Sequence, residues 1–319
     1  MTRERPTPQD GPARFRLPVR QLLIVLGLVA TAYAAALLIW GDSPRTSLAQ
    51  LGWAAGLQAA SLCLLNYGLR GLRWRFWMAQ HGRHFGLWQG LRLYLAGYAF
   101  TPTPGNVGEA VRGLMLAHQP LGARQSLAIF GAERLADLLC LLLLCLPVAG
   151  WAWTQGLLQK APLWLMVGLV AGLVMAGLVL GLAYRFRHAL RRRLGWLQDA
   201  WACLRVRPWR WFALTLAAWG AQGVAVWLIC RALGASPGVL MATGFYAVAM
   251  VAGALSALPA GLGGTEVVLT GLLVAHGTVA GSALAITVLT RLLTLWLAVA
   301  LGLLALLYSA AIARDIRLR

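Results

Sequence analysis

Residues 101–109 read TPTPGNVGE and residues 259–266 read PAGLGGTE, and each stretch interrupts an apolar segment. Proline removes a backbone donor and glycine weakens a helix, so both stretches break helical structure. Broken backbone at membrane depth is tolerated only where protein or a water-filled cavity satisfies its polar groups. We therefore predict that the chain turns back inside the membrane at both places.

The composition around these two stretches is that of a membrane protein. Hydrophobic residues make up 60% of the 319 positions and charged residues only 12%. A soluble domain would have no polar surface left, whereas runs of about 20 apolar residues are long enough to cross a bilayer as helices. Such segments lie at about 21–40, 51–70, 87–103, 125–149, 162–184, 211–233, 239–258 and 282–308.

Basic residues are distributed unevenly between these segments. Residues 1–20, 70–92 and 185–210 carry five, five and eight arginines, and the C-terminal tail carries three more. The intervening loops contain only Arg45, Lys160 and Arg231. By the positive-inside rule, the arginine-rich segments and both termini are cytoplasmic. This also accounts for the net charge of +19 without a nucleic-acid partner, since no polar domain is present to display the basic residues.

The side of the membrane assigned to each loop determines which segments cross the bilayer and which turn back, and this predicts the fold. Residues 87–124 must begin and end on the cytoplasmic side, and residues 239–280 must begin and end outside. We predict an all-α polytopic membrane protein with about six spanning helices and two re-entrant hairpins as an inverted repeat. The expected organisation is a basic cytoplasmic segment at 1–20, one transmembrane domain at 21–308 with an amphipathic cytoplasmic segment at 185–210, and a tail at 309–319.

Charged residues inside the apolar segments are the candidate functional residues. Glu109 precedes Arg134 by the same 25 positions that separate Glu266 from Arg291, which supports the inverted repeat. A charge at the bilayer centre costs about 2.5–3.5 kcal/mol, so these groups should face one another. Glu133 and Asp137 share one helix face with Arg134, and we expect Arg134 to pair with Asp137.

Two roles are open for this charged set. The arginines could offer a forked pair of donors to a phosphate headgroup. Alternatively, every carboxylate is consumed in ion pairs that only lock the hairpins in place. Glycine amides at the two turns could also approach an anion, or the glycines could serve close helix packing; the residues concerned are Gly105, Gly108, Gly261, Gly263 and Gly264.

The same residues carry a resemblance to a known family. The stretches 104–112, 133–137 and 259–266, together with Thr290 and Arg291, resemble the flippase-like transmembrane domain of lysylphosphatidylglycerol synthases and its stand-alone relatives. The resemblance adds Arg112 to the substrate-binding candidates and implies translocation of a modified phospholipid or a polyprenyl-linked lipid. Eleven residues follow Tyr308, so we expect neither a soluble aminoacyl-transferase domain nor synthase activity.

We accordingly expect a lipid flippase or scramblase of the bacterial inner membrane rather than an enzyme. The five cysteines show no metal-ligand spacing, and no metal or cofactor is expected. A secondary transporter of a small anionic or zwitterionic solute is the first alternative. An accessory subunit of a lipid-modifying enzyme is the second, and an enzyme using Glu133 and Asp137 as acid and base is the third. We expect two possible protein partners, namely a lipid-modifying enzyme and a second copy of the chain.

Overall fold

A computed structural model describes residues 43–103, 106–113, 121–156, 195–256 and 258–317, together with Gly27 and Thr31. These residues are helical with no β-strand. The predicted apolar segments 21–40 and 162–184, the basic N-terminal segment and residues 185–194 lie outside this description or almost wholly so. The elements are α2 (Ser43–Gln80), α3 (Leu87–Ala96), η1 (Gly97–Phe100), η2 (Val107–Gly113), α4 (Ala123–Leu144), α5 (Leu146–Thr154), α8 (Gly195–Arg205), α9 (Pro208–Ala232), α10 (Val239–Leu255), α11 (Gly264–Ala275), α12 (Ala280–Arg291), η3 (Leu292–Trp296) and α13 (Leu297–Arg317).

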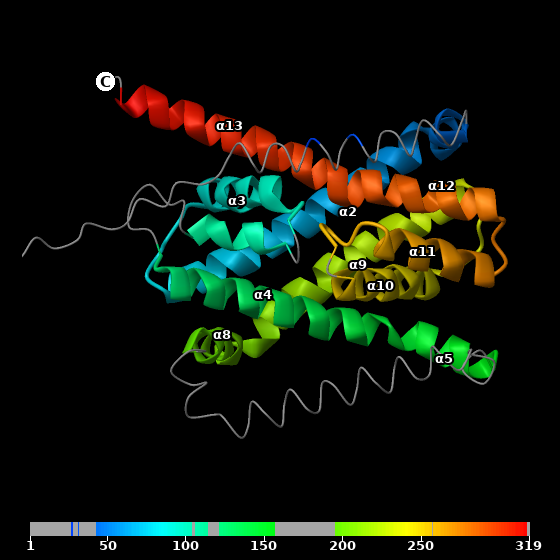
Figure 1. Cartoon of the computed structure of the whole chain (residues 1–319), viewed down its shortest axis with the longest axis horizontal. Helices are drawn as coiled ribbons and strands as arrows, with labels where there is room; N and C mark the ends of the chain where they lie inside the picture. The colour runs from blue at the N-terminus through cyan, green and yellow to red at the C-terminus, as the bar shows by residue number, and fades with distance from the viewer. Residues whose placement is uncertain are drawn as a thin grey trace, which may run out of the picture.

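Helices α2 and α9 make the most extensive contact between described elements. In Figure 1, α13 and α4 run on opposite sides of the bundle, with α2, α9 and α10 between them. Three stretches are long and apolar enough to cross a membrane, namely Ala123–Thr154, Pro208–Ala232 and Ala280–Ser309. The part of the chain that the structure describes is therefore a helical bundle of membrane-spanning character, as the sequence predicts.

Helix α2 corrects one prediction. Residues 70–92 were expected to form a cytoplasmic loop, but α2 continues to Gln80 and only residues 81–86 separate it from α3. Arg70 and Arg73 lie inside the helix, and Arg73 is completely buried. The assignment of Arg70 and Arg73 to a loop was wrong because carboxylates from another helix neutralise both arginines inside the bundle.

The second Pro/Gly stretch forms a tight turn between two short helices. Helices α10 and α11 pack against each other, and both are too short to be counted as full membrane spans. Ala260, Gly261 and Gly263 adopt positive φ angles in the turn between them. Only glycine takes this conformation at little steric cost, which explains two of the glycines in the stretch.

The first Pro/Gly stretch is built differently. Helix α3 runs into the short 3₁₀ helix η1, and a second 3₁₀ helix, η2, carries Glu109 and Arg112. Asn106 has a positive φ of 56° just before η2. Short 3₁₀ segments replace regular helix here, so the two Pro/Gly stretches differ in local structure.

The C-terminal segment is one long helix with an internal π-turn. The prediction placed an apolar segment at 282–308, whereas α12, η3 and α13 run without a break from Ala280 to Arg317. The π-turn η3 begins directly after Arg291. The Tyr67 hydroxyl is 2.9 Å from the carbonyl oxygen of Leu293 and 3.1 Å from that of Thr294. A π-turn frees backbone carbonyls from the regular helix ladder, and here Tyr67 serves them as donor.

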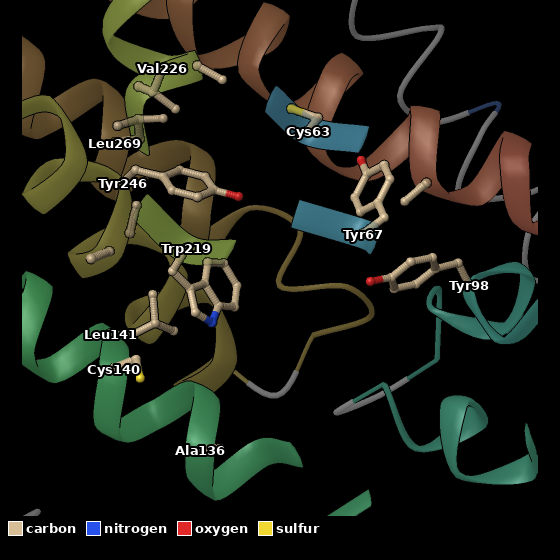
Figure 2. Close-up of a cluster of buried hydrophobic side chains, with 14 of the residues drawn as sticks. Cys63, Tyr67, Tyr98, Ala136, Cys140, Leu141, Trp219, Val226, Tyr246 and Leu269 are labelled. Atoms are coloured by element: carbon tan, nitrogen blue, oxygen red, sulfur yellow. The ribbon is translucent and has the colours of Figure 1, made fainter. Parts of the chain in front are cut away.

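The interior of the bundle is aromatic. Figure 2 shows Tyr246 of α10 and Trp219 of α9 on one side of the centre, and Tyr67 of α2 and Tyr98 of η1 on the other. The Trp219 and Tyr246 rings are 6.2 Å apart, and the Tyr246 hydroxyl is 3.2 Å from Gln222 Oε1.

Helix α8 is the described part of the predicted cytoplasmic amphipathic segment. It packs on α4, and Trp196 covers Gly131, where a Cβ atom would lie 2.7 Å from the indole. Arg124 Nε at the start of α4 is 2.8 Å from Asp199 on α8. Leu197 and Trp201 face outward, with 40% and 61% exposure. An apolar face on a short helix that is not packed against protein suits an interfacial position.

Candidate functional site

The site is centred on Asp137 of α4. Its carboxylate is 2.7 Å from Arg73 Nη1 and 2.9 Å from Arg70 Nη2, and it accepts a hydrogen bond from Trp219 Nε1 at 3.2 Å. Arg134 Nη2 approaches the same carboxylate at 3.1 Å, which confirms the predicted pairing of Arg134 with Asp137. Arg73 Nη1 also lies 2.7 Å from the hydroxyl of Thr215. Three helices are thus tied together at one buried acid.

Glu109 and Glu133 lie beside this centre. Arg112 forms an ion pair with Glu109 in the same short helix and reaches Glu133 on α4 at 3.1 Å. Glu109 accepts a hydrogen bond from the Thr101 hydroxyl at 2.9 Å and lies 3.7 Å from Arg134. The side chain of Glu109 is only 2% exposed. Charge-assisted bonds of this kind are the way a membrane interior retains ionised groups.

Aromatic rings and a glycine position the guanidinium groups. The Arg112 guanidinium lies 4.3 Å from the Tyr94 ring centroid, and that of Arg70 lies 5.3 Å from the Trp219 ring. Such stacking stabilises a desolvated cation. A Cβ atom at Gly97 would come within 1.9 Å of Arg112 Nε, so only glycine leaves room for this side chain. Tyr94 and Gly97 belong to α3 and η1, so the Arg112 side chain of η2 lies against these two elements and reaches Glu133 on α4.

A second and separate ion pair occupies the turn between α10 and α11. Arg291 Nε is 2.7 Å from Glu266 Oε1, and Arg291 Nη2 donates to the Ala260 carbonyl at 2.8 Å. The other carboxylate oxygen of Glu266 is buried and forms no hydrogen bond. Each hairpin glutamate therefore contacts the arginine 25 residues later, as the spacing suggested. No ion pair within the described ranges links this pair to the site around Asp137.

The charges around Asp137 do not balance. Among the described residues, four guanidinium groups face three carboxylates, which leaves one positive charge; the members are Arg70, Arg73, Arg112, Arg134, Glu109, Glu133 and Asp137. Arg134 is the most accessible member, with 30% of its side chain exposed. Its Nη2 atom lies 3.1 Å from the Asp137 carboxylate and 3.7 Å from that of Glu109, and its buried Nε atom has no hydrogen-bond partner among the described residues. A partly exposed guanidinium in a site with more guanidinium groups than carboxylates is chemically suited to an oxyanion such as a phosphate.

A small cavity leads to the carboxylates of this site. It has a volume of about 10 Å³ and is lined among others by Trp74, Ser126, Glu109, Arg112 and Glu133. This is far smaller than the hundreds of Å³ that pockets for organic ligands need. In this conformation the interior of the site is closed, and Arg134 is the point at which the site reaches the surface.

Sequence reasoning missed Arg70 and Arg73. Both were assigned to a cytoplasmic loop, although Asn66, Arg70, Arg73 and Trp77 recur at the spacing of one helix face. All four are buried in the structure. A polar stripe that continues an apolar helix with a period of 3.6 residues would have identified them as inward-facing.

The predicted glycines differ in what the structure shows for each of them. Gly105 lies outside the described residues, and Gly108 lies in η2. Gly261 and Gly263 have φ angles of 67° and 83°, and the Gly261 amide donates to the Leu258 carbonyl at 3.0 Å. At Gly264 a Cβ atom would lie 3.1 Å from Ser256. Turn geometry and close packing account for these three positions, while an approach of their amides to an anion stays a prediction.

A comparison with protein families decides the affiliation of the chain. The sequence model of the family described as lysylphosphatidylglycerol synthase TM region matches residues 23–302, which include every residue of the site. The chain belongs to this family. No curated protein matched the sequence.

Membership of the lysylphosphatidylglycerol synthase TM family relates the chain to membrane proteins of lipid modification or translocation. Within the described ranges, no group of three histidine, cysteine or acidic side chains is placed to hold a metal ion. The carboxylates of the site instead face arginines.

Proposed function

We propose that the chain is a translocase that moves a phospholipid or a lipid-linked substrate between the two leaflets. The observation that carries this proposal is the excess positive charge around Asp137 together with the partial exposure of Arg134. A buried cation without a full set of partners is costly in a bilayer. A headgroup phosphate supplies the missing negative charge.

The position of Arg134 on α4 suggests how a headgroup would reach the site. Leu135, Leu138 and Leu142 are exposed on the outward face of α4, and Arg134 lies at the edge of this apolar stripe. A lipid beside α4 can therefore place its phosphate at Arg134 while its acyl chains stay in the bilayer. Asp137 and Glu109 hold the guanidinium ready and compete with the phosphate for it, so binding would be reversible.

We propose that the two Pro/Gly regions are re-entrant hairpins and that the fold contains six spanning helices in an inverted repeat. Support comes from the short lengths of α10 and α11 and from the matching contacts of Glu109 with Arg134 and of Glu266 with Arg291. The arginine-rich termini favour a cytoplasmic location for both ends in a bacterial inner membrane.

We also propose that the chain itself is not an enzyme. Glu133 and Asp137 are the best candidates for an acid and base pair, but Asp137 contacts three guanidinium groups and Glu133 contacts Arg112 at 3.1 Å. A general base needs a free lone pair within reach of a substrate proton.

Two kinds of protein partner remain proposals: a lipid-modifying enzyme and a second copy of the chain. Co-purification of the complete protein from its native membrane tests both.

The experiment is a leaflet-exchange assay on purified protein in vesicles. Fluorescent phospholipids and a fluorescent polyprenyl phosphate are compared, and radiolabelled phosphate and amino acids test uptake of soluble substrates. We expect lipid exchange that falls with Arg134→Gln, because Arg134 is the partly exposed cation of the site, while the variant stays folded and inserted. Uptake of a soluble substrate without lipid exchange would instead establish a secondary transporter.

A further inference from the structure

A hollow at the surface of the bundle is lined by an arginine whose Nε atom has no hydrogen-bond partner among the described residues. The hollow has a volume of about 530 Å³ and lies between α3 and α13, lined by Trp88, Gln89, Arg92 and Tyr308. The Arg92 guanidinium is 5.5 Å from the Tyr308 ring centroid, and Arg92 Nε is buried without a hydrogen bond. Trp88 and Tyr308 are 79% and 60% exposed. Exposed tryptophan and tyrosine beside an arginine are typical of the level of the lipid headgroups.

An apolar groove adjoins this hollow and shares Trp88 with it. The groove lies between α2 and α3 and has a volume of about 220 Å³; its lining includes Leu65, Gly68, Leu69, Leu72 and Leu91. A Cβ atom at Gly68 would meet nothing within 4 Å, whereas one at Gly71 would lie 3.1 Å from Leu91. The helices therefore close on each other at Gly71 and leave a gap at Gly68. The width of a single methylene chain suits such a groove.

We infer that the groove and the hollow together form a binding site for one anionic glycerophospholipid. The phosphate would lie in the hollow beside the Arg92 guanidinium, and one acyl chain would lie in the groove over Gly68. The charge at Arg92 decides in favour of a lipid, because an apolar helix from a second copy would fill the groove and leave the guanidinium unsatisfied. An anionic lipid supplies both the apolar chain and the acceptor oxygens.

This site is distinct from the one around Asp137. Helix α3 separates the two, since Tyr94 faces Arg112 on the inner side and Arg92 faces Tyr308 on the other side. The inference therefore does not rest on the proposed translocation. A lipid bound here would join α3 to α13 at the surface and would be retained as a resident lipid.

The test is native mass spectrometry of the complete protein after reconstitution into vesicles of phosphatidylglycerol and phosphatidylcholine and extraction in mild detergent. We expect the wild type to retain one phosphatidylglycerol molecule and Arg92→Gln to lower its occupancy by about tenfold or more. Arg231→Gln is the matched control, because Arg231 also stacks on an aromatic ring, that of Trp227 at 5.0 Å, but lines neither hollow nor groove. Equal occupancy in the wild type and Arg92→Gln would overturn the inference.

A second pair of variants tests the acyl chain without touching the charge. Gly68→Phe should fill the groove and displace the lipid, whereas Gly68→Ala should leave it bound, since the open space at Gly68 accepts a methyl group. A photoreactive benzoylphenylalanine at position 88 should crosslink to phosphatidylglycerol. Retention of the lipid by Gly68→Phe, or a crosslink to a second copy or to another segment of the same chain, would contradict the proposed occupant.

Discussion

Asp137→Asn is expected to destabilise the fold more than any other single change of a carboxylate outside the hairpin turns. The substitution preserves the shape of the side chain but removes the charge that faces Arg70, Arg73 and Arg134. Removing one partner of a buried ion pair costs about 3–5 kcal/mol, because the remaining charge is buried without compensation. The ratio of folded to unfolded protein should then fall by about a hundredfold or more.

The magnitude can be measured by reversible unfolding of the purified protein in mixed micelles of mild detergent and dodecyl sulfate. Asp199→Asn is the matched control, since Asp199 pairs with Arg124 at the surface and such pairs contribute about 0–1 kcal/mol. Arg73→Met combined with Asp137→Asn should be less destabilising than the sum of the single changes by about 1–3 kcal/mol. Equal stability of the two aspartate variants, or strict additivity of the Arg73 pair, would refute this reasoning.

Two further predictions concern packing and thiol reactivity. Gly302→Ala should lower the melting temperature by several degrees, because a Cβ atom there would lie 2.4 Å from the Ala99 backbone nitrogen. Gly271→Ala is the control and should leave the melting temperature unchanged, because a Cβ atom at Gly271 meets nothing within 4 Å. Thermal unfolding scans compare the two variants directly. Cys203 should resist maleimide at pH 7 until the protein unfolds, because it is 2% exposed and burial raises the pKa of its thiol to about 11. Labelling of the folded protein at Cys203 at the rate of a free thiol would contradict the packing of α8.

The ion pairs that the sequence predicted are those with a local or repeated signal. Arg134 and Asp137 are three positions apart on one helix, and the spacing of 25 residues occurs twice. The penalty for an unpaired charge in a bilayer makes pairing necessary, so candidates of opposite sign could be matched from the sequence. The contact of Arg112 with Glu133 joins two elements, and only the structure shows it.

Arg70 and Arg73 show what the sequence could not supply. Their partner Asp137 lies 67 and 64 positions away on another helix. A count of arginines assigns a basic cluster to the cytoplasm, and only tertiary packing shows that carboxylates neutralise it inside the bundle. The π-turn after Arg291 was equally hidden, because its freed carbonyls depend on Tyr67 from a distant helix.

The most direct test of the proposed function compares Arg134→Gln with Arg124→Gln in the vesicle assay for leaflet exchange of a fluorescent anionic phospholipid. Both arginines lie on α4, but Arg124 pairs with Asp199 at the surface and Arg134 lies at the edge of the charged site. We expect Arg134→Gln to lower the exchange rate at least about tenfold, in line with the loss of one charge-assisted hydrogen bond to phosphate, and Arg124→Gln to keep the wild-type rate. Equal exchange by the two variants, with both folded and inserted, would contradict translocation through this site.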